Sequence, residues 1–142
     1  EEFNVIKIYP STLKIEIKKT KFLAITKKNG IDYLVASNEN LIEIKDTNLE
    51  LPYIFGDIDV NNFLNFKKII DISNFEFNKI KSLYYFKSNR WDIMTKDGLL
   101  LKMPINLTVK KVNLIFEIIK KNNFNDVKII DFRQNNLMVI NE

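Results

Sequence analysis

Apolar and polar residues alternate with a period of two over much of this 142-residue chain, and this pattern most constrains its fold. Leu13, Ile15 and Ile17 alternate with polar residues, and a turn at Tyr9–Thr12 separates them from a similar segment around Val5. Successive side chains of a strand point to opposite faces, so such a segment buries one face and exposes the other. The pattern therefore predicts short strands, paired mostly as antiparallel neighbours.

Turn signals separate the expected strands. Asn29-Gly30 and Asp97-Gly98 are strong hairpin signals, because these residue pairs adopt the positive φ angles that tight turns require. We expect the segment Leu51–Gly56 to be a compact apolar loop that Gly56 closes. The further strands are predicted at residues 22–26, 31–35, 40–44, 79–86, 91–95, 99–103, 127–132 and 137–140.

Two segments have apolar residues three to four positions apart, which is typical of amphipathic helices. One follows Asp59 and the other follows Thr108, and both residue types are good helix N-caps. Trp91 is expected to be a core anchor buried against the second of these helices, because large aromatic side chains supply much of a small domain's buried area. The sequence thus predicts one α+β domain, a mostly antiparallel sheet with two helices.

The composition excludes many chemistries. The chain has no His and no Cys, which removes zinc and haem sites, thiol catalysis, disulfides and Ser-His nucleophiles. Its three glycines are too scattered for a phosphate-binding loop. Two carboxylate pairs, Asp57 with Asp59 and Asp92 with Asp97, are expected to be helix-cap and turn residues. We therefore expect no catalytic activity, no metal or other cofactor, and no small-molecule substrate.

The sequence also predicts no nucleic-acid binding and no membrane-spanning segment within these 142 residues. The net charge is only +4, and the aromatic residues among the lysines of segment 81–87 alternate as a buried strand requires, so we expect no nucleic-acid binding. The longest run without a charged residue is the eight residues Gln134–Asn141. A membrane-spanning helix needs about 20 mostly apolar residues.

Four short motifs follow one another along the chain. They are Tyr9-Pro10 with Leu13-Lys-Ile15, Leu51-Pro52 with Gly56, Trp91 with Asp97-Gly98 and Leu101, and Ile130-Asp131-Phe132-Arg133. Taken in this order, they resemble the bacterial cell division family FtsQ/DivIB. The resemblance implies that residues 1–20 form the last hairpin of a POTRA module and residues 21–142 the β domain that follows it.

The resemblance also implies a function. Proteins of this family are non-catalytic scaffolds of the divisome that link early and late cell division proteins, and their β domain holds the FtsB–FtsL pair. They are single-pass proteins of the bacterial inner membrane, with the body in the periplasm at the division septum. The membrane anchor and the rest of the POTRA module are expected upstream of Glu1.

The expected binding site is the apolar segment Leu137–Ile140, which has no charge or proline to guard it against pairing with another strand. A partner is expected to add there as a further strand. The resemblance implies that contacts cluster on this strand and on the preceding arginine, with a second arginine before the tryptophan. The candidate residues are Arg133, Gln134, Asn136, Leu137, Met138, Val139, Ile140 and Arg90.

Three alternatives stay open at this point. The last strand can instead be buried between two neighbours. The chain can also be a POTRA-type scaffold of an outer-membrane assembly or secretion system, which would share the first hairpin but not the Trp91 and Asp131-x-Arg133 segments. A small enzyme is a third alternative, disfavoured by the absence of His and Cys.

Overall fold

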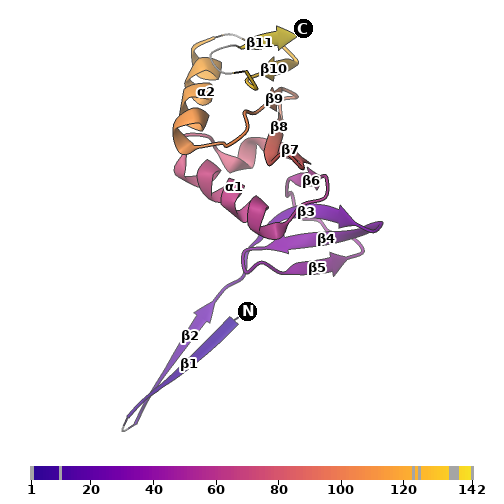
Figure 1. Cartoon of the computed structure of the whole chain (residues 1–142). Coiled ribbons are helices and arrows are strands. Elements are labelled where there is room, and N and C mark those ends of the chain that lie inside the picture. Colours follow the sequence, from indigo (N-terminus) through magenta and orange to yellow (C-terminus); the bar gives the residue numbers. More distant parts are fainter. Residues whose placement is uncertain (1, 10, 123, 125, 135–137, 142) are drawn as a thin grey trace.

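The computed structural model describes residues 2–9, 11–122, 124, 126–134 and 138–141. A nine-stranded mixed sheet carries two helices on one face, and a two-stranded hairpin extends away from it (Figure 1). The hairpin is β1 (Glu2–Ile8) and β2 (Thr12–Lys18). The other elements are β3 (Phe22–Lys28), β4 (Ile31–Ala36), β5 (Leu41–Ile44), β6 (Tyr53–Phe55), α1 (Val60–Ile72), the 3₁₀ turn η1 (Phe77–Lys79), β7 (Ile80–Phe86), β8 (Arg90–Thr95), β9 (Leu100–Lys102), α2 (Val109–Lys121), β10 (Ile129–Asp131) and β11 (Val139–Asn141).

The strands of the sheet follow the order β11-β10-β9-β8-β7-β6-β3-β4-β5. Five neighbouring pairs are antiparallel, while β3–β6, β6–β7 and β9–β10 are parallel. The predicted α+β class, with a mostly antiparallel sheet and two helices, is therefore confirmed.

The prediction of a loop over Leu51–Gly56 is wrong for its central residues. Residues Tyr53–Phe55 form β6, which lies inside the sheet between β3 and β7. Three residues are too few for an alternating pattern to be visible, and both partners of β6 are distant in sequence. Gly56 ends this strand with φ at +109°, where a Cβ atom would lie 2.5 Å from the carbonyl oxygen of Tyr85. The glycine is thus required by close packing as well as by its backbone conformation.

Both helices begin where the sequence predicts. The Asp59 side chain accepts hydrogen bonds from the N–H groups of Asn61 and Asn62 at 2.7 and 3.3 Å. Thr108 Oγ1 accepts one from the N–H of Lys111 at 3.3 Å. These bonds satisfy donors that a helix leaves without intrahelical partners in its first turn.

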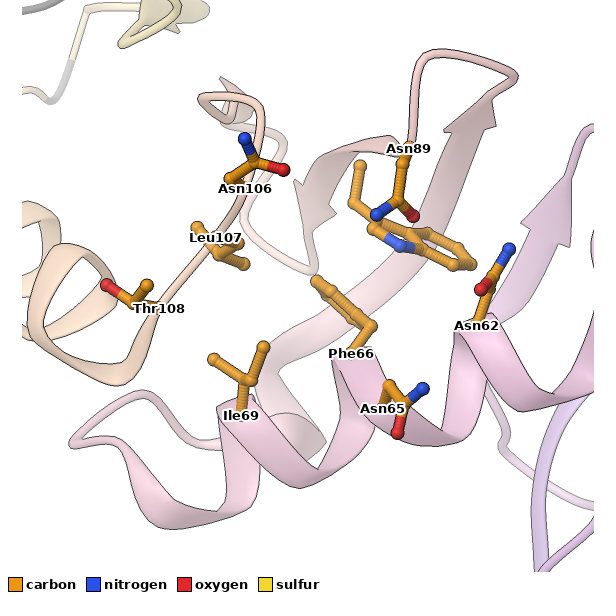
Figure 2. Close-up of a pocket in the computed structure, with 9 residues that line it drawn as sticks. Asn62, Asn65, Phe66, Ile69, Asn89, Asn106, Leu107 and Thr108 are labelled. Carbon is orange, nitrogen blue, oxygen red and sulfur yellow. The ribbon is translucent and has the colours of Figure 1, made fainter.

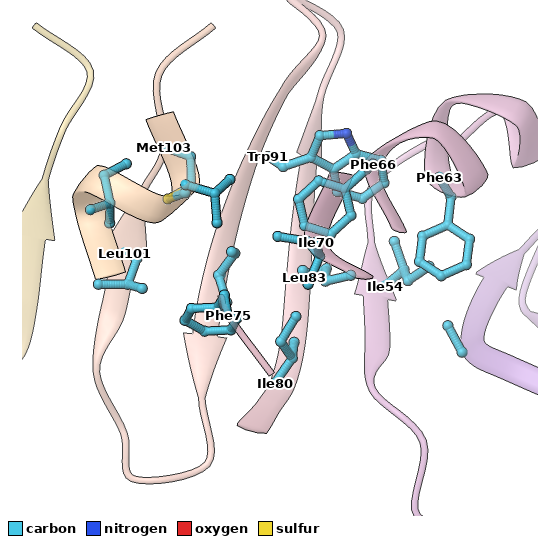
Figure 3. Close-up of a cluster of buried hydrophobic side chains, with 14 of the residues drawn as sticks. Ile54, Phe63, Phe66, Ile70, Phe75, Ile80, Leu83, Trp91, Leu101 and Met103 are labelled. Carbon is cyan, nitrogen blue, oxygen red and sulfur yellow. The ribbon is translucent and has the colours of Figure 1, made fainter. Parts of the chain in front are cut away.

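The core lies between the helices and one face of the sheet. Strand register places one apolar residue from each of five adjacent strands in a row on this face, and each is at most 1% exposed: Ile54, Leu83, Ile93, Leu101 and Ile130. The helices cover this row with their buried side chains, which are Phe63, Phe66 and Ile70 from α1 and Val112 and Ile115 from α2. Figure 3 shows the α1 side chains above the sheet residues.

Trp91 is buried, as predicted, with 4% of its surface exposed. The expectation that it packs against the second helix is wrong. Its ring centre lies 4.8 Å from that of Phe66 and 6.2 Å from that of Phe63, both on α1 (Figure 3). The ring centre of Tyr85, on β7, lies 4.7 Å away. Local sequence does not encode which helix lies over a given strand, so the pattern could not decide between the two.

Trp91→Ala should lower the free energy of unfolding by about 3–5 kcal/mol, because it removes a large side chain from a packed aromatic cluster. Urea denaturation followed by circular dichroism measures this change. Leu114→Ala is the matched control, because Leu114 is 58% exposed on α2 and its truncation should change stability by no more than about 0.5 kcal/mol. An unchanged midpoint for the Trp91 variant would contradict this account of the core.

Candidate protein interface at the last strand

The last strand, β11, lies at one end of the nine-stranded sheet. It pairs with β10 on one side, and no other strand of the described residues pairs with its second side. The strand was expected at Leu137–Ile140, whereas β11 spans Val139–Asn141. Asn136 and Leu137 lie outside the described residues.

The pairing of β10 with β9 determines which main-chain groups β10 offers to β11. The N–H of Phe132 donates to the carbonyl of Lys102 at 2.9 Å, and the carbonyl of Lys128 accepts from the N–H of Leu100 at 2.9 Å. In a parallel pair, alternate residues of one strand bond to the same neighbour. Residue 130, between these two, therefore bonds to β9, and the main-chain groups of residues 129 and 131 face β11; at the start of the pair, the N–H of Lys128 also donates to the carbonyl of Asn141 at 3.3 Å.

This alternation identifies the exposed main-chain groups of β11. Val139 is opposite Asp131 and bonds inward to β10, whereas Ile140 is opposite Ile130, whose main-chain groups bond to β9. The N–H and C=O of Ile140 consequently point away from the sheet. The side chains of Val139 and Ile140 are 44% and 41% exposed, one on each face of the strand. Met138, just before the strand, is instead partly buried against the core.

Arg133 lies between β10 and β11 in sequence, and its guanidinium holds the Asp131 carboxylate. Nε is 2.9 Å from both carboxylate oxygens, and Nη2 is 2.5 Å from Oδ2. These hydrogen bonds lower the pKa of the Asp131 carboxyl below its ordinary value, although partial burial acts in the opposite direction. Arg133 is 44% exposed, and its remaining N–H groups have no hydrogen-bond partner among the described residues, so they can bind a further acceptor. Gln134, the next residue, is exposed.

Arg90 has a more enclosed position at the start of β8. Its Nε lies 3.2 Å from Oδ1 of Asp92, its guanidinium carbon lies 3.9 Å from the centre of the Phe86 ring, and its side chain is 17% exposed. Asp92 lies within the predicted strand 91–95, and nothing in the sequence indicated its burial: it is 4% exposed and also accepts from the N–H of Met103 at 3.2 Å. Burial raises the pKa of the Asp92 carboxyl, and the charge of Arg90 offsets only part of this effect.

The strand register places the carboxylates that bind Arg90 and Arg133 in one row across the sheet. Asp92, Lys102 and Asp131 are opposite one another on β8, β9 and β10, and the row ends at Val139 of β11. This row lies on the face of the sheet opposite the two helices, since its neighbours in each strand form the buried row. The structure thus brings Arg133, Asp131 and Val139 together beside the open edge, while Arg90 lies two strands further in.

The described part of the chain contains no group of three or more carboxylate side chains positioned to hold a metal ion. Within the same residues, no helix is both long and apolar enough to cross a membrane.

The geometry defines an α+β fold in which one edge of β11 has no partner strand among the described residues, next to an arginine bound to a carboxylate. A family model described as "Cell division protein FtsQ/DivIB, C-terminal" matches residues 24–133. This match covers most of the chain, and the chain therefore belongs to the FtsQ/DivIB family of cell division proteins. The expected family is confirmed, and so is a role in cell division. The match ends at Arg133, so β11 lies beyond it.

A solved structure supports the fold. The chain is similar to the major extracytoplasmic domain of the bacterial cell division protein DivIB from Geobacillus stearothermophilus, with a TM-score of 0.50 and 13% sequence identity. The similarity covers 75% of this chain and 98% of that domain. A comparison with curated proteins found no match.

Asp131 and Asp92 should have pKa values on opposite sides of the ordinary aspartate value. Carbon-13 NMR of the carboxyl groups should show Asp131 titrating at lower pH and Asp92 at higher pH. Arg133→Ala should raise the pKa of Asp131 towards its ordinary value, because the hydrogen bonds from the guanidinium are the main cause of the lowering.

The lowered pKa of Asp131 also predicts how the stability of the fold depends on pH. A carboxyl whose pKa is lower in the folded state stabilises the fold above its unfolded pKa, and this contribution is lost as the pH falls through the folded value. The Arg133→Ala variant should therefore lose more stability, relative to the unchanged protein, at pH 7 than at pH 3. An equal loss at both pH values would show that Arg133 does not stabilise the ionised Asp131.

Proposed function

We propose that this domain is a non-catalytic scaffold of the divisome that binds a partner segment as an additional antiparallel strand along β11. The single observation that carries the proposal is the outward direction of the Ile140 main-chain groups at the open end of the sheet. The partner is the FtsB–FtsL pair, through a segment that follows its coiled coil. In this role the domain links early and late cell division proteins.

Main-chain pairing would supply the register of the complex. An unpaired edge offers N–H and C=O groups in the spacing that an incoming strand requires. The half-exposed side chains of Val139 and Ile140 would then be covered on both faces of the new strand pair. Residues 134–141 carry no charged side chain that would oppose this pairing.

Arg133 would supply specificity for an acidic residue of the partner. Asp131 already fixes the orientation of the guanidinium, so little further side-chain freedom is lost when a second carboxylate binds. Arg90 is largely enclosed by Asp92 and Phe86 and would contact the partner only at the margin of the surface. Gln134, Asn136, Leu137 and Met138 complete the proposed contact segment.

The proposed location follows from the family and from the solved relative, which is an extracytoplasmic domain. We infer that this chain also lies outside the cytoplasm, in the periplasm at the division septum, and that an upstream single-pass segment anchors it in the inner membrane. Residues 1–20 would be the last hairpin of a POTRA module and residues 21–142 the β domain. The separation of β1–β2 from the nine-stranded sheet supports this division (Figure 1). The match to the sheet region also favours this role over that of an outer-membrane assembly or secretion scaffold.

Ile140→Pro should weaken binding of the partner at least about tenfold more than Ile140→Ala, because proline removes the outward N–H and obstructs strand pairing. Isothermal calorimetry with a synthetic peptide of the FtsB segment after its coiled coil measures both affinities. Proline is tolerated in an edge strand where the N–H faces solvent, so both variants should keep their melting temperatures. Equal affinities of two folded variants would refute strand addition.

A further inference from the structure

A cleft of about 280 Å³ opens on the helical side of the molecule, between α1, the β7–β8 turn and the loop that leads into α2 (Figure 2). None of its lining residues belongs to β10, β11 or the segment between them. The cleft is therefore separate from the edge-strand site. Its floor is apolar, and its rim is formed by side-chain amides and one hydroxyl.

No charged side chain lines this cleft, although the chain has 22 basic and 18 acidic residues. An ionised ligand would lose hydration there without gaining a counter-charge. The lining thus disfavours phosphates, nucleotides and charged peptide side chains, and it favours a neutral ligand that can form hydrogen bonds.

The rim offers unused hydrogen-bonding groups. Among the described residues, the side-chain amides of Asn65, Asn89 and Asn106 have no hydrogen-bond partner. Asn62 uses one amide N–H on the hydroxyl of Tyr85 at 3.0 Å and keeps its side-chain carbonyl free. Each amide carries both donors and an acceptor, as a peptide group does. The rim is consequently complementary to the main chain of an extended peptide.

Two of these asparagines lie in turns whose main chain forms hydrogen bonds. Asn89 and Asn106 both have positive φ angles, 56° and 55°. The Lys111 ammonium holds the second turn by donating to the carbonyls of Ile105 and Asn106, at 3.3 and 3.1 Å. The first turn is closed by the N–H of Asn89, which donates to the carbonyl of Phe86 at 3.0 Å. These bonds restrain the backbone at both amides, which lowers the entropy lost on binding.

The residues on the floor of the cleft favour a peptide over a sugar as the ligand. Phe66 and Trp91 stack on each other with ring centres 4.8 Å apart and an angle of 26°, and they are 3% and 4% exposed. Their ring faces are therefore occupied, and little remains for a pyranose ring to stack on. The edges of these rings, together with Ile69 and Leu107, form a small apolar depression that suits one aliphatic or aromatic side chain.

We propose that this cleft binds an extended, uncharged segment of a partner protein. One apolar side chain of the segment enters between Phe66 and Leu107, and the adjacent peptide groups bond to the amides of Asn65, Asn89 and Asn106. The proposal does not depend on how β11 binds its own partner.

Capped tetrapeptides of the form acetyl-Ser-X-Asn-Ser-amide, with X as Leu, Ile, Met or Phe, are the probes. Binding should change the fluorescence of Trp91, the single tryptophan of the chain, and shift the NMR amide signals of residues 65, 89 and 106 saturably at millimolar peptide. The same peptide with Glu or Lys at X should bind at least about fivefold more weakly.

The triple variant Asn65→Ala, Asn89→Gly, Asn106→Gly should bind at least about fivefold more weakly than the unchanged protein. Glycine keeps the positive φ angles while removing the amides. Asn61→Ala is the matched control, an exposed asparagine of α1 outside the cleft, and it should bind normally. If the triple variant unfolds, Asn65→Ala alone must show the weakening.

Three results would overturn the proposal. The first is the absence of saturable binding by any of the four neutral peptides. The second is equal binding by the Asn65→Ala and Asn61→Ala variants. The third is a trimer of N-acetylglucosamine that produces the same shifts at lower concentration than the peptides, which would assign the cleft to a glycan.

Discussion

The shared register of strands β6 to β10 is the constraint on which the rest of the structure depends. It aligns Ile54, Leu83, Ile93, Leu101 and Ile130 on one face, where α1 and α2 cover them. A slip of one residue in any strand would turn its apolar side chains away from the helices and its polar ones into the core. The same register places the buried Asp92 carboxylate on the opposite face, beside Arg90, and directs Ile140 outward at the end of the sheet.

The two ends of the sheet differ in a way that bears on function. The strand β5, at the far end, contains Glu43 and is followed by Lys45 and Asp46, and charges of this kind discourage pairing with another chain. The strand β11 has no such guard, and its neighbouring arginine is oriented by Asp131. Among the described residues, the two ends of the sheet thus differ in charge, and the end without charged side chains is the one where we propose that a partner pairs.

The local pattern predicted both helices with their caps, the hairpin turns at Gly30 and Gly98, and most of the strands. It missed β6 because three residues between Pro52 and Gly56 form parallel pairs with distant strands. The helix that covers Trp91 and the burial of Asp92 depend on tertiary packing, which no spacing along the chain encodes.

The candidate site was predictable only in part. The Asp131-x-Arg133 spacing was visible in the sequence, but the outward direction of Ile140 required the pairing of both neighbouring strands. The cleft was not predicted, because asparagine is common throughout this chain, with 19 residues, and the four on its rim do not stand out.

Hydrogen exchange of the Ile140 amide, followed by NMR with and without the FtsB segment, tests the central claim most directly. In the free domain this N–H should exchange rapidly, while that of Val139 is protected by its bond to β10. On binding, the exchange of Ile140 should slow at least about tenfold, because the partner's carbonyl accepts its hydrogen bond. Unchanged exchange at Ile140 in a saturated complex would contradict strand addition at β11.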